Sequence, residues 1–324
     1  MREEWKFAYK HDTRILLDDD CPPIIPLPHI EGMMLCHFEY RNEDIQSKFK
    51  GEFDFLHLAP HLPTTYCEII IDDSYWKHPF MPNYPEHNDE EKLVTVMNVS
   101  GTLITVLRLI GFNRCITPCI LKNGSLSAAP NCEDGSIEFY PHHPILLPMP
   151  MLNEGKARLS REDFEWVCKA HLTLYRLFET NDLTPSMTAM SYYYHDMPLR
   201  AKMSLIWAAI EDLLRPGKSG TRFGIRSRGA MLLGRSEEEI EDFYKHFGKL
   251  YDRRSAATHG RKFSYNRGLS ITTDNRRLEA DLDALGTSYV LLCEILIRVI
   301  DKGLIFTDSE LNELEEQYKE KFPK

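Results

Sequence analysis

The sequence predicts an α+β domain over residues 1–150, followed by an all-α helical bundle over residues 151–324. Short β-prone runs, separated by clusters of proline and aspartate, fill the first part of the chain. The segment 144–150 then carries three prolines in seven residues, which continue neither a helix nor a central strand. Beyond it, apolar residues recur at helical spacing. These observations place the domain boundary near residue 150.

The first domain is predicted to combine strands with one long helix. The candidate strands cover residues 13–17, 33–40, 67–71, 115–121 and 136–140, which are rich in β-branched and aromatic side chains. A helix is predicted from Asn88, a suitable N-cap, to about Ile110, with Gly111 at its end. The sequence does not set the order of the strands. A sensing or partner-binding role for this domain is an open hypothesis.

Helices follow one another through the second domain. The first is predicted at residues 160–179, where Ser160 and Asp163 form a capping signal. Pro185 and Pro198 mark the starts of the next two, the second of which covers residues 199–214. Further helices are predicted at residues 222–233, 236–259, 278–303 and 308–322. The apolar stripes of facing helices would form the core of a bundle.

The composition is that of an ordinary globular protein, with 43% hydrophobic and 27% charged residues. The charged N-terminus predicts no signal peptide, and the two most apolar runs, 93–112 and 289–300, contain charged residues. Eight scattered cysteines favour a reducing compartment. We therefore expect a cytoplasmic protein without a membrane span.

No metal ion and no cofactor is expected. Cys115 and Cys119 lie close together, but no second pair of ligands follows at the spacing of a zinc site. The histidines of the first domain fall in no recognised ligand spacing either. They are His57, His61, His78, His87, His142 and His143.

Basic residues concentrate between residues 215 and 267, although the chain as a whole carries a formal net charge of −10. This segment holds thirteen Lys or Arg against six Asp or Glu, a net charge of +7. Such a patch is a plausible contact surface for a polyanion. The alternative is a helix-rich segment whose basic side chains simply face solvent.

The most informative helix is predicted between Ser236 and Gly260. Ser236 is a good N-cap with Glu239 three residues later, and Gly260 suits the left-handed position just after a helix. One face of this helix is apolar. Its members are Ile240, Phe243, Phe247, Leu250, Tyr251 and Thr258.

Two basic residues lie close together at the end of this helix. Arg254 falls near the middle of the apolar face, whereas Arg253 falls off it. A guanidinium there is costly to bury unless it is paired or lines a cleft, and His259 follows within reach of the same cleft. Arginine binds phosphate, and histidine transfers protons near neutral pH, so the pair suits phosphodiester chemistry. The alternative is a chance pairing of a surface arginine and a capping histidine.

The run Arg254-Ser-Ala-Ala-Thr-His259 resembles the Arg-x4-6-His motif of the HEPN superfamily (higher eukaryotes and prokaryotes nucleotide-binding). The wider sequence resembles the Apea-like HEPN group, and the matching pieces agree in order and spacing as well as in residue type. They cover residues 206–215, 228–234, 249–255 and 258–260. The resemblance spans residues 160–305, and residues 1–150 resemble no family.

The resemblance implies an activity and roles for four residues. HEPN nucleases are metal-independent endoribonucleases, in which the ribose 2′-hydroxyl attacks the adjacent phosphorus and leaves a cyclic phosphate and a 5′-hydroxyl. His259 would be a general acid or base, Arg254 would hold the phosphate, and Ser255 would support it. Glu211 matches an acidic family position; it would orient His259 or pair with Arg254, unless it is an ordinary surface carboxylate.

Partners follow from the same resemblance. The predicted RNA contacts are Arg253, Arg261, Lys262 and Arg228. A homodimer through the motif helix is expected, because family sites usually form where two such helices meet. The implied role is an effector of a prokaryotic antiviral (abortive infection) or toxin system, with an antitoxin or a phage-derived trigger as a possible partner. The alternative is a non-catalytic HEPN module that binds RNA, a nucleotide or a protein.

Overall fold

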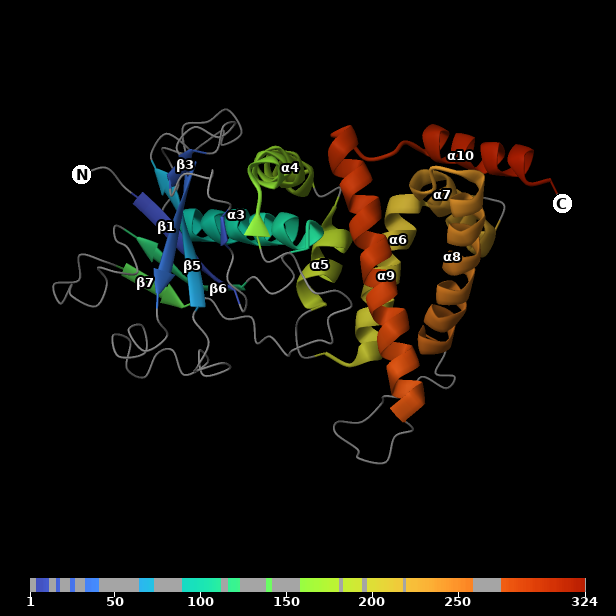
Figure 1. Cartoon of the computed structure of the whole chain (residues 1–324), viewed down its shortest axis with the longest axis horizontal. Coiled ribbons are helices and arrows are strands. Elements are labelled where there is room, and N and C mark those ends of the chain that lie inside the picture. Colours follow the sequence, from blue (N-terminus) through green and yellow to red (C-terminus); the bar gives the residue numbers. More distant parts are fainter. Residues whose placement is uncertain are drawn as a thin grey trace. The chain divides into compact units, whose positions relative to one another are not determined.

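The structure is a computed structural model. It describes residues 4–11, 16–17, 24–26, 33–40, 64–72, 89–111, 116–122, 138–141, 158–180, 183–193, 197–217, 220–258 and 275–323. The chain divides into two compact units, which are described separately below (Figure 1). The first unit comprises residues 1–144 and 155–176, and the second comprises residues 145–154 and 177–324.

The first unit contains a sheet of six strands in the order β3-β4-β5-β1-β6-β7, with antiparallel neighbours throughout. A separate parallel pair joins β2 to β8. The strands are β1 (Glu4–His11), β2 (Leu16–Leu17), β3 (Ile24–Pro26), β4 (Met33–Tyr40), β5 (Thr64–Asp72), β6 (Ile116–Lys122), β7 (Glu138–Pro141) and β8 (Arg158–Leu159). The structure therefore adds β1, β3 and β8 to the strands that the sequence predicts.

Two helices accompany this sheet. Helix α3 (Asp89–Leu109) contacts β1 and β6, and the chain leaves it through Gly111 at φ 102°, as predicted. Helix α4 (Arg161–Glu179) begins with the predicted capping box, in which Asp163 N donates to Ser160 Oγ and Ser160 N donates to Asp163 Oδ2. The predicted single boundary near residue 150 assigns α4 to the second domain, whereas α4 up to Arg176 groups with the first unit.

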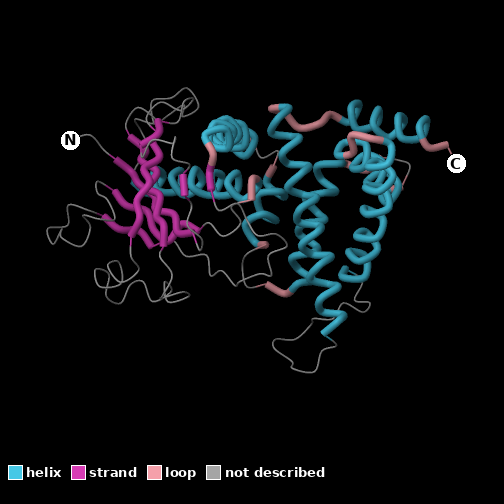
Figure 2. Tube along the Cα trace, viewed as in Figure 1, coloured by secondary structure: helices cyan, strands magenta, loops and turns pink. Residues whose placement is uncertain are grey.

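The second unit is all-helical in its described residues, as predicted (Figure 2). Its helices are α5 (Thr184–Tyr192), α6 (Leu199–Leu214), α7 (Thr221–Leu233), α8 (Glu237–Thr258), α9 (Asn275–Lys302) and α10 (Asp308–Lys321). Helix α6 contacts α5, α7, α8 and α9, while α10 packs on α7. The fully buried Trp207 of α6 and Phe247 of α8 fill the interior between these helices.

Local sequence accounts for where several of these helices begin. Pro185 lies in the first turn of α5, and Pro198 directly precedes α6. At the start of α8, Glu239 N donates to Ser236 Oγ at 3.2 Å, as the predicted cap requires. The carboxylate of Glu239, however, accepts from Arg235 N rather than from Ser236 N.

Helices α7 and α8 approach each other closely because α7 carries a glycine at the contact. A Cβ atom on Gly229 would lie 2.5 Å from the ring of Phe247. The absence of a side chain at Gly229 therefore sets the spacing between these two helices.

No helix among the described residues is long and apolar enough to cross a membrane.

Candidate active site

Helix α8 places Arg254, which directly precedes its last turn, against α6. Arg254 lies among the packed residues with 22% of its side chain exposed, whereas the adjacent Arg253 is 46% exposed. The helical spacing predicts this difference, since Arg254 shares the face of the buried Phe247, Leu250 and Ala257. Arg254 is thus a partly buried cation near the C-terminal end of α8.

Glu211, in the last turn of α6, is the counter-ion of Arg254. Its Oε2 accepts a hydrogen bond from Arg254 Nη2 at 3.1 Å, and its Oε1 lies 2.8 Å from the same nitrogen. Among the described residues, neither Glu211 Oε1 nor the buried Arg254 Nε has a hydrogen-bond partner. The pair therefore uses one terminal nitrogen of the guanidinium. A fork-to-fork arrangement would use two.

Two effects act in opposite directions on the Glu211 carboxyl. Burial raises the pKa of Glu211, and the positive charge of Arg254 opposes that rise. The position of Glu211 in the last turn of α6 also disfavours a negative charge there, because the C-terminal end of a helix dipole is negative. The charge of Arg254 therefore offsets part of the effect of burial on the pKa of Glu211.

Aromatic side chains set the alignment of α6 and α8 one turn before this ion pair. The rings of Trp207 and Tyr251 meet edge to face, with centroids 5.6 Å apart. Trp207 Nε1 donates to Ser288 Oγ of α9, and the Arg254 guanidinium carbon lies 5.6 Å from the Tyr251 ring centroid. None of Trp207, Tyr251 and Ser288 is among the site residues that the sequence predicts, although Trp207 and Glu211 are four residues apart on one helix.

Arg253 is held by a buried carboxylate. Its Nη1 donates to Asp281 Oδ1 of α9 at 3.3 Å, and the Asp281 side chain is buried. Because Arg253 remains partly exposed, the exposed side of its guanidinium can still bind a phosphate. The sequence gives no signal for Asp281, which lies 28 residues away on α9, between the acidic residues Glu279 and Asp283.

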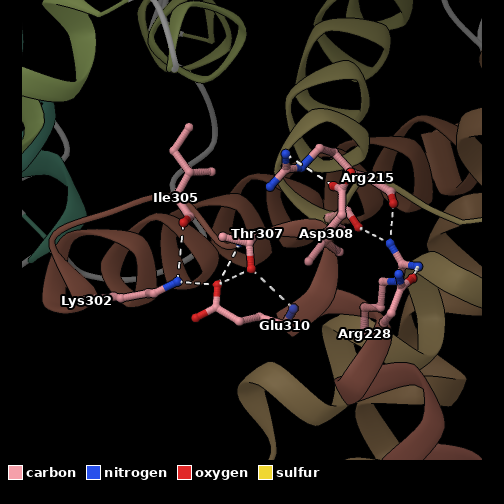
Figure 3. A network of polar contacts seen from close by, with 9 residues as sticks. Arg215, Arg228, Lys302, Ile305, Thr307, Asp308 and Glu310 are labelled. Carbon is pink, nitrogen blue, oxygen red and sulfur yellow. Dashed lines mark hydrogen bonds and ion pairs between the residues drawn. The ribbon is translucent and has the colours of Figure 1, made fainter.

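The predicted RNA contact at Arg228 is wrong. Its guanidinium is 2% exposed and forms an ion pair with the buried Glu315 of α10 at 3.0 Å. Arg228 also donates to Asn312 Oδ1 and to the main-chain oxygen of Leu214. It donates as well to the main-chain oxygen of Arg215 at the end of α6 (Figure 3). Since these bonds engage all three of its nitrogens, Arg228 fixes α10 and the end of α6 instead of binding RNA.

Ion pairs also hold other described basic residues of the segment 215–258. Arg215 pairs with Asp308 (Figure 3), Arg222 with Asp252, and Lys245 with Glu241. Lys249, in contrast, is exposed and forms no ion pair with a described residue. The surface available to a polyanion is therefore narrower than the charge of the sequence segment indicates.

Several predicted site residues lie at or beyond the end of α8. Ser255 is partly exposed and follows Arg254 in the helix, without a hydrogen-bond partner for its hydroxyl among the described residues. His259, Arg261 and Lys262 lie outside the described residues. Within the part of the chain that the structure describes, no group of three or more His, Cys, Asp or Glu residues could hold a metal ion.

The described groups provide a cation for an oxyanion and a carboxyl group beside it. Arg254 can offset negative charge on a phosphate, and Glu211 can accept or donate a proton at the same position. Comparison with protein-family models, curated proteins and solved structures finds no match to the chain.

Proposed function

We propose that the chain is a metal-independent endoribonuclease of the HEPN type. In this mechanism, Arg254 binds the scissile phosphate and offsets the charge that develops in the transition state. His259 transfers the proton of the attacking 2′-hydroxyl or of the leaving oxygen. Ser255 and Glu211 support these two groups, and Arg253, Arg261 and Lys262 contact the RNA backbone.

One observation carries this proposal: α6 and α8 hold Arg254 in a partly buried ion pair, five residues before His259. An arginine that served only solubility would remain in water, where it has no desolvation cost. The partly buried position instead gives Arg254 a fixed place and a low-dielectric surrounding, in which its charge acts strongly on a bound phosphate.

We place this activity in a prokaryotic antiviral or toxin system, where RNA cleavage arrests the infected cell. The first unit would then restrain or trigger the nuclease, through an antitoxin or a phage-derived molecule. A cytoplasmic location follows from an RNA substrate. This role rests on the resemblance to Apea-like HEPN proteins stated above.

A non-catalytic HEPN module is the second candidate, and a specific observation favours it. Arg254 and Arg253 are both neutralised by carboxylates, and Arg228 is buried. Fewer cations therefore face solvent than an RNA-binding surface usually presents. Such a module would bind RNA, a nucleotide or a protein without cutting it.

Toxicity on expression separates these two candidates. We expect expression of the chain in a bacterial host to arrest growth, and His259→Ala to relieve the arrest. His246→Ala is the matched control, because His246 is exposed on α8 away from Arg254. Equal toxicity of the two histidine variants would exclude the nuclease as its cause.

We further propose a homodimer through α8. The exposed face of α8 carries Glu241, Asp242, Lys245 and Lys249, so two antiparallel copies would place opposite charges together. Light scattering at micromolar concentration should give the mass of a dimer that weakens with added salt. A monomer at low salt would contradict this proposal.

A further inference from the structure

Arg254 has one anionic partner. Among the described residues, its only ion pair is with Glu211. The nearby acidic residues are engaged elsewhere, since Asp252 pairs with Arg222 and Asp281 pairs with Arg253. The guanidinium therefore carries one carboxylate on one terminal nitrogen, a donor that a phosphate oxygen would also use.

The geometry limits how a second anion can approach. Arg254 Nε is buried, so an oxyanion reaches the guanidinium only through its terminal nitrogens. Both oxygens of Glu211 already lie within 3.1 Å of Nη2. A phosphate at the same edge would place two anions in contact in a partly desolvated position, where like charges repel strongly.

We propose that Glu211 and a substrate phosphate bind Arg254 in alternation, so that the carboxylate occupies the phosphate subsite in this structure. This inference rests on the proposed function, because it concerns the same arginine. Glu211 then has a second role besides supporting the site. While it is paired with Arg254, Glu211 lowers the affinity of the site for any oxyanion.

Displacement of Glu211 costs free energy, and this cost makes the site select polyanions over small oxyanions. A displaced carboxylate loses the one counter-ion that the described residues provide, while it remains mostly buried at the negative end of α6. A single small oxyanion compensates poorly for this cost. A polyanion makes further contacts, for example at Arg253, and so displaces the carboxylate more readily than free phosphate does.

Phosphate titration of the full chain tests this inference. Inorganic phosphate is titrated at constant ionic strength into the wild type, Glu211→Gln and Glu238→Gln, and binding is followed by calorimetry. Glu211→Gln keeps the shape of the side chain and removes the competing charge. Glu238→Gln is the matched control, because it makes the same charge change on α8 at a carboxylate that pairs with no described residue.

We expect Glu211→Gln to bind phosphate about tenfold more tightly than the wild type, and Glu238→Gln to change the affinity little. The gain should disappear in the double variant Glu211→Gln, Arg254→Gln, and circular dichroism should give folded spectra for all variants. An unchanged or weaker affinity of Glu211→Gln, or no phosphate binding by any variant, would overturn the alternation. Neither result depends on RNA cleavage, so the proposed nuclease activity is tested separately.

Discussion

At the scale of single residues, Arg228 and Arg254 have different roles. Arg228 and Arg254 belong to neighbouring helices, and the sequence predicts contact with RNA phosphate for both. Arg228 proves to be buried in a saturated network with Glu315 and Asn312, whereas Arg254 keeps a buried Nε without an acceptor. Saturated, buried donors indicate a structural role, whereas the partly exposed Arg254, with one ion-pair partner among the described residues, retains capacity for a ligand at its terminal nitrogens.

Loss of Arg228 should therefore affect stability. In Arg228→Ala, the buried Glu315 loses the buried cation with which it forms an ion pair, so we expect the free energy of unfolding to fall by about 3 kcal/mol. Urea denaturation followed by circular dichroism measures this loss. Arg222→Ala removes an exposed ion pair and should cost less than about 1 kcal/mol. Equal losses for the two variants would contradict a structural role for Arg228.

The sequence could not predict that Arg228 is buried in an ion pair, because its partner Glu315 lies 87 residues further along the chain. The same limit applies to Asp281, whose burial and pairing with Arg253 depend on the packing of α9 against α8. The position of Arg254 was predictable, since helical periodicity alone places it on the face that contacts the core. Its pairing with Glu211 was one of two predicted alternatives.

At the scale of elements, the sequence predicts those features that depend on nearby residues. The starts of α4, α5 and α6 follow from Ser160 with Asp163, from Pro185 and from Pro198. Strand β1, in contrast, joins the sheet between β5 and β6, which begin about 60 and 112 residues later. The alternation of aromatic residues at Trp5, Phe7 and Tyr9 suits a strand, but no nearby residue indicates which strands pair with it.

The contact of α7 with α8 gives a prediction at this scale. Gly229→Ala places a methyl group within 2.5 Å of the Phe247 ring, so we expect it to lower the free energy of unfolding by about 1–3 kcal/mol. Phe247→Leu in the same chain should recover part of the loss, because it shortens the opposing side chain. Thermal denaturation measures both changes.

The control for Gly229→Ala is Gly101→Ala in α3. A Cβ at Gly101 has no atom within 4 Å, so this variant should be neutral or slightly stabilising, since alanine favours a helix. If Gly229→Ala changed the free energy of unfolding as little as Gly101→Ala, the close approach of α7 and α8 would not restrict the size of the side chain at position 229.

At the scale of the whole molecule, net charge alone is a poor guide to partners. The chain is acidic at −10, and its basic segment at +7 predicts a polyanion surface. Much of that positive charge is neutralised by carboxylates of α6, α8, α9 and α10, which only the three-dimensional arrangement reveals. RNA binding would then depend on a few cations around Arg254 rather than on a broad basic face.

RNA cleavage by the purified chain tests the proposed function most directly. Wild type, His259→Ala and the control His246→Ala are incubated with a mixed RNA pool in EDTA, and the ends of the products are identified. We predict that the wild type and His246→Ala cleave RNA and leave cyclic phosphate and 5′-hydroxyl ends, whereas His259→Ala does not. Cleavage that EDTA abolishes, or that His259→Ala retains in full, would contradict a metal-independent nuclease built on Arg254 and His259.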